Sequence, residues 1–183
     1  MKLDLTKSTK GYSISLKDKL MRIIWIISWN CVRFLPKQFS FVKVFLLRCF
    51  GAEIGEKCLI DFGVKIWIPQ NLVLKEGFVA IGKNVEIYNY AKVTIGRMTV
   101  VSQYCYLITG THDYTNPIMP LLWKPITIGN EVWVAAGCWV FPGVSIRDGA
   151  VIAARSNVTK DMPAWQVCAG SPCKPFKERI INI

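Results

Sequence analysis

The segment ITIGNEVWVAAGCWVFPGVSIRDGAVIAARSNV (residues 126–158) carries an aliphatic residue at every sixth position. The repeated residues are Ile128, Val134, Val140, Ile146, Ile152 and Val158. An α-helix would repeat its apolar residues about every 3.6 positions, and a half-buried strand would repeat them every two. A period of six instead predicts a coil of three short strands, in which each hexad forms one side and points one aliphatic side chain inward.

The same period runs through the preceding part of the chain. Its aliphatic residues are Ile54, Ile60, Ile66 and Leu72, then Ile81 and Ile87, then Ile95, Val101 and Leu107. A glycine often follows them, and we expect glycine and asparagine at the corners because both tolerate turn geometry. Stacked coils pair their backbones and bury a continuous apolar column. Residues 51–165 are therefore predicted to form a mainly β, parallel β-helix.

One long interruption breaks this period. After Leu107 the next aliphatic residue in register is Ile128, 21 positions later, so about 15 residues near 109–124 must leave the coil. Long loops in compact folds are usually functional or disordered, and the turn formers in GTHDYTNP favour a shaped loop. The loop contains His112, the single histidine of the chain. Its imidazole suits a general base that deprotonates an alcohol, although a surface histidine without a role is the alternative.

The first 50 residues differ from the rest. They carry ten Lys and Arg against two Asp, in a chain of net charge +11. Apolar residues at helical spacing predict helices over 15–34 and 39–51, the second closed by Gly51. This N-terminal extension (residues 1–50) could cap the first coil, or it could bind an anionic membrane surface as a basic amphipathic helix. No aromatic-basic motif indicates nucleic acid.

The cysteines and the hydropathy indicate the compartment. The chain has seven cysteines, an odd number, with no CxxC spacing and a single histidine. We therefore expect no metal site, no disulfide framework and a reducing, cytoplasmic environment. The apolar run at 23–29 is too short to span a bilayer, so any contact would be peripheral, at the inner face of the membrane.

The motifs resemble those of the hexapeptide-repeat acetyltransferases, whose fold is a left-handed parallel β-helix. The segments TIGRMTVVSQYCYLITGTHDY and KPITIGNEVWVAAG flank the loop as in galactoside and maltose O-acetyltransferases. KVFLLRCFGAEIG and VTKDMPAWQVCAGSPCKPFKER are similar to the colanic acid biosynthesis acetyltransferases. The resemblance covers roughly residues 50–180. It implies a homotrimer with active sites between subunits, acetyl-CoA as donor, His112 as base, and a CoA-binding tail or short helix at 166–183.

Binding residues follow from the same resemblance. Those on the coenzyme side are Ala136, Ala154, Thr159, Lys160, Lys174 and Lys177. Ala136 replaces a serine of the galactoside enzyme, so only its backbone amide could serve. Lysine attracts phosphate without the bidentate grip of arginine, and a solvated basic tail is the alternative for the three lysines. Those on the acceptor side are Asn89, Asp113, Tyr114 and Trp133.

Alternatives remain open for the acceptor residues and for the function. Asn89 could equally be a corner asparagine, Trp133 could pack at a corner, and Asp113 could orient His112 or bind a sugar hydroxyl. The expected function is O-acetylation of a sugar in exopolysaccharide, capsule or lipopolysaccharide biosynthesis. N-acylation of a nucleotide-linked amino sugar and a non-enzymatic scaffold are the alternatives. A γ-type carbonic anhydrase is excluded because it needs three histidines.

Overall fold

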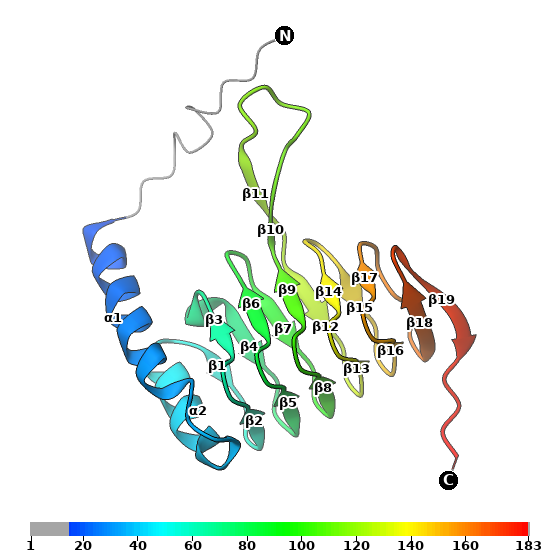
Figure 1. Cartoon of the computed structure of the whole chain (residues 1–183), viewed down its shortest axis with the longest axis horizontal. Coiled ribbons are helices and arrows are strands. Elements are labelled where there is room, and N and C mark those ends of the chain that lie inside the picture. Colours follow the sequence, from blue (N-terminus) through cyan, green and yellow to red (C-terminus); the bar gives the residue numbers. More distant parts are fainter. Residues whose placement is uncertain (1–14, 183) are drawn as a thin grey trace.

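The structure is a computed structural model that describes residues 15–182, so the first 14 residues of the predicted N-terminal extension lie outside it. It is a three-sided parallel β-solenoid with two helices at its N-terminal end (Figure 1). Each coil adds one strand to each of three parallel sheets. The predicted mainly β, parallel β-helical class is confirmed.

The three sheets stack the coils in register. The first sheet contains β1 (Glu53–Ile54), β4 (Leu72–Leu74), β7 (Val93–Ile95), β12 (Ile126–Ile128) and β15 (Ser145–Ile146). The second contains β2 (Cys58–Ile60), β5 (Val79–Ile81), β8 (Thr99–Val101), β13 (Trp133–Val134), β16 (Val151–Ile152), β18 (Gln166–Gly170) and β19 (Cys173–Glu178). The third contains β3 (Lys65–Ile66), β6 (Glu86–Tyr88), β9 (Tyr106–Ile108), β14 (Trp139–Val140) and β17 (Asn157–Val158).

The repeated aliphatic side chains form the core. All six from Ile128 to Val158 are buried, and so are the residues two positions before them, so each hexad points two side chains inward. One residue was placed in the wrong register. Leu72 is buried, but β4 pairs Leu74 with Ile54 of β1 and with Ile95 of β7. Leu74 is therefore the equivalent of Ile54, because two extra residues enter the corner before it.

The glycines that follow the aliphatic residues serve stacking, which corrects the interpretation of them as turn formers. A Cβ on Gly96 would lie 2.5 Å from the backbone of Gly129 in the next coil. A Cβ on Gly55 or on Gly82 would lie 2.5 or 2.7 Å from the backbone of the following coil. Gly96 also donates its N–H to the Ile128 carbonyl at 2.8 Å. These positions need glycine because a side chain would separate hydrogen-bonded coils.

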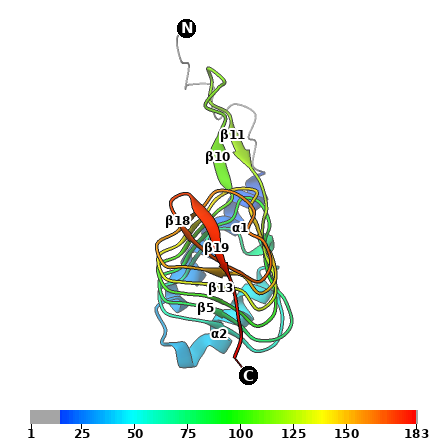
Figure 2. The same cartoon turned by 90° about the vertical axis from the view of Figure 1, so that its right-hand side faces the viewer.

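Extra residues enter mainly at one corner of the solenoid, between the third and the first sheet; one more enters between Leu74 and Ile81, which are seven positions apart. Eight residues separate Ile66 from Leu74 and Ile87 from Ile95, and 21 separate Leu107 from Ile128. The last excursion is an antiparallel hairpin of β10 (Gly110–His112) and β11 (Leu121–Trp123). We call residues 109–124 the arm, which stands away from the solenoid in both views (Figures 1 and 2).

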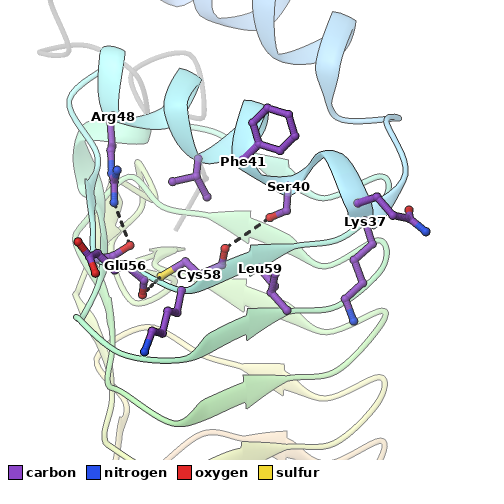
Figure 3. Close-up of a pocket in the computed structure, with 11 residues that line it drawn as sticks. Lys37, Ser40, Phe41, Arg48, Glu56, Cys58 and Leu59 are labelled. Carbon is purple, nitrogen blue, oxygen red and sulfur yellow. Dashed lines mark hydrogen bonds between the residues drawn. The ribbon is translucent and has the colours of Figure 1, made fainter.

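The helix α2 (Ser40–Cys49) covers the open end of the first coil. Lys43 is fully buried, and its Nζ donates to the carbonyls of Leu35, Ile60 and Asp61 at 2.8–3.2 Å. Burial lowers the pKa of Lys43, while the charge of Asp61 acts in the opposite direction. Figure 3 shows α2 above the first coil, with Ser40 and Arg48 directed at its backbone. This helix, preceded by the short 3-10 turn Lys37–Phe39, closes the core.

The helix α1 (Leu16–Val32) attaches to the solenoid through two tryptophans. Trp25 and Trp29 are buried, and their indole N–H groups donate to the carbonyls of Ile66 and Val64. An α-helix turns by about 100° per residue. The apolar stripe seen in the sequence therefore lies on the side of α1 opposite to Trp25 and Trp29. Its members remain exposed: Leu16 86%, Leu20 58%, Ile23 54% and Ile27 61%. This stripe therefore does not cap the coils.

The C-terminal segment is a hairpin rather than a helix within the described residues. β18 pairs in parallel with β16, so it continues the second sheet of the solenoid beyond residue 165. β19 then returns antiparallel to β18 and covers the last coil. Between residues 15 and 182, no helix has both the length and the apolar character needed to cross a bilayer.

Replacing Gly96 by alanine should lower the free energy of unfolding by about 1–3 kcal/mol, because the new methyl group meets backbone that cannot turn away. The measurement is chemical unfolding followed by circular dichroism. Gly137→Asn is the matched control: Gly137 has φ +70°, which asparagine tolerates, and a Cβ there meets only the Arg155 side chain at 3.5 Å. Equal destabilisation of both variants would contradict the stacking role.

Candidate active site

The arm holds His112 in one protonation pattern. His112 is exposed at the end of β10, opposite Leu121 of β11. Its Nδ1 lies 2.7 Å from the carbonyl oxygen of Met119. A carbonyl can only accept, so Nδ1 must carry the proton when the ring is neutral. The lone pair then sits on Nε2, which is the arrangement a general base requires.

The tip of the arm is shaped by its own polar side chains. The Asp113 carboxylate accepts from the backbone N–H and the hydroxyl of Thr115, at 3.0 and 2.6 Å. Asn116 accepts from the N–H of Ile118 in the same manner. The hydroxyl of Thr115, followed by its backbone N–H, lowers the pKa of Asp113. Asp113 thus shapes the turn and makes no bond to His112, while Tyr114 is 84% exposed beside it.

A cluster of side chains that we call the platform lies beneath the arm. Its members are Trp67, Glu86, Tyr88, Tyr90 and Tyr106. A Cβ on Gly110 would meet the Tyr88 ring at 3.0 Å, so this ring packs against the base of β10. Side chains two apart on a strand share a side, so His112 points to the side of the hairpin that Tyr88 occupies. The Trp67 and Tyr88 rings are 4.8 Å apart, and Tyr88 lies 5.0 Å from Tyr90. The Tyr88 ring of the platform therefore lies on the side of the arm to which His112 points.

Glu86 is the acidic centre of this platform. It forms an ion pair with Lys65 at 3.2 Å and accepts from the indole of Trp67 at 3.1 Å and the phenol of Tyr106 at 3.4 Å. Burial raises the pKa of Tyr88, and burial together with the nearby Glu86 carboxylate raises that of Tyr106. These phenols thus remain neutral hydrogen-bonding groups.

The platform was not predicted from the sequence, although the sequence carries a signal for it. The outward positions flanking Ile66, Ile87, Leu107 and Val140 are mostly aromatic or charged. They are Lys65, Trp67, Glu86, Tyr88, Tyr106, Ile108, Trp139 and Phe141. Listing the outward residue of each hexad by side would have shown that one side of the solenoid is aromatic.

Asn89 does not face an open site. Its side chain is fully buried, with Oδ1 accepting from the N–H of Ile68 and Nδ2 donating to the Ile68 carbonyl at 2.6 Å. Both ends of the amide are therefore used to hold the preceding corner, next to the 3-10 turn Pro69–Asn71. Of the two roles that the sequence left open for Asn89, the structure favours the corner asparagine.

The predicted coenzyme residues lie on the coils after the arm. Ala136 and Ala154 occupy the same corner in successive coils, where the Arg155 N–H donates to the Ala136 carbonyl. Thr159 and Lys160 are exposed at the end of the third sheet. Lys174 and Lys177 are exposed on β19. The six residues predicted to bind the coenzyme therefore lie at one end of the molecule, on several of its edges.

Trp133 is separate from the arm and the platform. It points outward from the second sheet, half exposed, and its indole N–H donates to the Ser102 hydroxyl at 3.0 Å. The four predicted acceptor residues are therefore divided: Asp113 and Tyr114 on the arm, Asn89 in the core, and Trp133 on another side. Within residues 15–182, no group of three His, Cys, Asp or Glu side chains could hold a metal ion.

Two curated relatives match most of the chain. WcaF of Escherichia coli K12, an acetyltransferase assigned to colanic acid biosynthesis, is 38% identical over 160 residues, which is 87% of each chain. The galactoside O-acetyltransferase of the same organism is 34% identical over 136 residues, covering 73% of this chain and 66% of that protein. No family model matches the sequence.

Solved structures share the fold. A hexapeptide-repeat acetyltransferase from Vibrio cholerae, solved with acetyl-CoA, has a TM-score of 0.82 at 21% identity and covers 97% of this chain and 98% of its own. The N-acyltransferase AntD from Bacillus cereus, solved with CoA and an amino-sugar nucleotide, has a TM-score of 0.58 at 18% identity over 74% of this chain and 88% of its own.

Removing the Asp113 carboxylate should loosen the arm. In Asp113→Ala we expect the Thr115 amide to exchange its hydrogen about tenfold faster at neutral pH, since one hydrogen bond is lost. The measurement is hydrogen–deuterium exchange corrected for intrinsic rates, with Asp148→Ala as the distant control.

The pH dependence of this protection has a defined sign. The pKa of Asp113 is lowered in the folded chain, so the protection is present above the usual aspartate pKa of about 3.9 and is lost only as the pH falls through the lowered value. Protection of Thr115 that is unchanged in Asp113→Ala, or that disappears well above pH 4, would contradict this role.

Proposed function

Because the chain belongs to the hexapeptide-repeat acetyltransferases, we propose that it transfers the acetyl group of acetyl-CoA to a sugar hydroxyl during exopolysaccharide synthesis. Membership follows from the 38% identity to WcaF over 87% of both chains. The chain is therefore an acetyltransferase. The assignment of WcaF to colanic acid synthesis supports an acceptor of the same class, and an acceptor built on the inner face of the membrane agrees with a cytoplasmic enzyme.

His112 acts as the general base in this proposal. Its Nε2 takes the proton of the acceptor hydroxyl as the oxygen attacks the thioester carbonyl. The tetrahedral intermediate then expels the CoA thiolate, which receives the proton from the imidazolium. The Met119 carbonyl, 2.7 Å from Nδ1, holds the ring with Nε2 free to accept the proton. This hydrogen bond is the observation that carries the proposal.

The aromatic platform would hold the acceptor sugar. Tyr88 and Trp67 offer flat apolar surfaces, and Glu86 with Tyr106 offers acceptor and donor atoms for hydroxyl groups. Such a mixture of apolar walls and a few polar groups is typical of small-molecule sites. The platform lies on the side of the arm to which His112 points, so an acceptor bound there would reach Nε2.

The coils after the arm would bind acetyl-CoA. Lys160, Lys174 and Lys177 are exposed cations at that end of the molecule, suited to the phosphates of the coenzyme. Ala136 and Ala154 present backbone and small side chains along one corner, where an extended pantetheine arm could lie. The acetyl-CoA bound to the Vibrio cholerae neighbour supports this donor.

O-acetylation is favoured over N-acylation. The galactoside O-acetyltransferase is related in sequence at 34% identity, whereas AntD shares only the fold at 18%. The neutral Nε2 base also suits a hydroxyl, which must lose its proton during attack. An ester product would be cleaved by mild alkali and by hydroxylamine, and an amide product would not.

A homotrimer would complete the site. The arm projects beyond the body of the solenoid (Figure 2), and its His112, Tyr114 and Leu122 are exposed. The coenzyme residues lie on later coils, away from the arm of the same chain. A neighbouring copy seated beside the arm would bring a second solenoid surface to His112 and enclose the reacting groups.

Replacing His112 by alanine should reduce acetyl transfer by about 10²–10⁴-fold, the usual contribution of a general base, while acetyl-CoA binding is retained. The measurement is release of free CoA with nucleotide sugars and lipid-linked oligosaccharides as acceptors, and calorimetry for coenzyme binding. Arg97→Gln, at the corner between β7 and β8 and away from the arm, is the control. Near-normal transfer by His112→Ala would refute the base assignment.

Peripheral contact with an anionic membrane is a second part of the proposal. The exposed stripe of Leu16, Leu20, Ile23 and Ile27 on α1 has Lys17 on one flank and Lys19 on the other. On α2, Phe41 and Phe45 are also 68% exposed. An apolar stripe bordered by lysines is the pattern of a helix lying at the surface of an anionic bilayer.

The double variant Leu20→Ser with Ile27→Ser should bind vesicles of phosphatidylglycerol and phosphatidylcholine at least tenfold more weakly, because it removes two of the inserted side chains. Cosedimentation measures binding, and Phe78→Ser is the control. Deleting the whole helix would be uninformative, since Trp25 and Trp29 belong to the core. Membrane contact would be contradicted if the double variant bound vesicles as well as the unchanged protein does. It would also be contradicted if the substitutions changed the mass of the oligomer and left vesicle binding as it was.

A further inference from the structure

A pocket of about 280 Å³ separates α1 from the start of the third sheet. The stacked rings of Trp25 and Trp29, 4.9 Å apart, form one wall, and Trp67 lies on the solenoid side. We call this space the α1 pocket. It lies near the lower limit of the roughly 300–1,000 Å³ typical of ligand sites, which leaves room for one sugar unit or a small charged group.

The charged groups that line the α1 pocket are mostly cationic. They are Arg22, Arg33, Lys65 and Glu86. Glu86 is already paired with Lys65 and accepts hydrogen bonds from the Trp67 indole and the Tyr106 hydroxyl. Arg22 uses one Nη for the hydroxyl of Tyr90 at 3.0 Å, which leaves other donors of its guanidinium. The pocket therefore carries an excess of positive charge and of hydrogen-bond donors.

Arg33 is the group that points to a ligand. Among residues 15–182, one buried side-chain nitrogen or oxygen atom has no hydrogen-bond partner, and it is the Nε of Arg33. Buried polar groups are almost always paired, and one left unpaired calls for an explanation. The guanidinium is held in place by the Phe34 ring, 4.4 Å from its Cζ. Arg33 also lines the pocket, so a carboxylate or phosphate bound there would pair with its guanidinium.

The α1 pocket is continuous with the platform of the candidate active site. Trp67 and Glu86 belong to both. From Trp67 the rings continue through Tyr88 and Tyr90 to Trp123 of the arm, which stacks on Tyr90 at 5.9 Å. A chain of sugar units could thus occupy the platform at one end and the pocket at the other.

We propose that the α1 pocket binds an anionic group, a carboxylate or a phosphate, on the part of the acceptor adjacent to the acetylated sugar. The proposal rests on the proposed function for its identification of the ligand as a sugar acceptor. Arg33 and Arg22 would bind the anion, and the tryptophans would pack against the attached ring. The enzyme would then select a charged, extended acceptor over a free neutral monosaccharide.

Three probes of one sugar separate the sources of charge. Glucose, glucuronate and glucose 1-phosphate are titrated into the full-length protein with saturating CoA, so that the coenzyme phosphates cannot compete. Tryptophan fluorescence reports binding, because Trp25, Trp29 and Trp67 line the pocket. At least one charged probe should bind tenfold or more tightly than glucose, since charge-assisted hydrogen bonds add at least this much. Which one binds identifies carboxylate or phosphate.

Substitutions then locate the binding. Arg33→Gln should weaken the charged probe by about tenfold or more, Arg33→Lys should restore part of the affinity, and Arg97→Gln should leave it unchanged. Lys65→Gln should also weaken binding of the charged probe, because Lys65 is a cation that lines the pocket, and the change lies outside α1. Circular dichroism confirms folding of each variant.

Several outcomes would overturn the proposal. The first is that glucose and both charged probes bind equally well. The second is that the affinity for the charged probe is unchanged in both Arg33→Gln and Lys65→Gln. The third is a change in the mass of the oligomer, which would show that the pocket holds another subunit. Acetyl transfer does not enter the titration. His112→Ala should bind the probes normally, so a failure of the base assignment and a failure of the pocket are distinguishable.

Discussion

The backbone hydrogen bonds between successive coils are the constraint on which the rest of the structure depends. The N–H groups that join the coils meet carbonyls of an adjacent coil at about 2.8–3.2 Å, so neighbouring coils must have a similar outline. This requirement keeps the period close to six, places glycine where coils approach most closely, and leaves most of the extra residues at the corner between the third and the first sheet. The arm leaves from that corner, and so its position above the aromatic platform follows from the stacking.

Much of this was predictable from the sequence because period and packing are local properties. The aliphatic column, the interruption after Leu107 and the candidacy of His112 all follow from counting residues. The register of Leu72 was missed because two residues enter the corner before β4 and shift the inward position to Leu74. The burial of Asn89 was missed because its partner, Ile68, lies 21 residues away in the neighbouring coil.

Surfaces formed by several coils were harder to predict. The platform gathers Trp67, Glu86, Tyr88 and Tyr106 from successive coils, about 20 residues apart, and no short motif contains them together. The sequence left open whether the N-terminal extension covers the first coil or meets a membrane; in the structure Trp25 and Trp29 donate to carbonyls of the solenoid, and the apolar stripe of α1 faces outward. In both cases a contact between distant segments decided what the local pattern left open.

The arm fixes the protonation pattern of its histidine through the Met119 carbonyl. Because His112 is the single histidine of the chain, protein labelled with ¹⁵N-histidine gives one imidazole spectrum. Recorded at a pH where the ring is neutral, it should show a protonated Nδ1 with a slowly exchanging hydrogen and an unprotonated Nε2. A protonated Nε2, or two averaged nitrogen shifts from interconverting tautomers, would contradict the account.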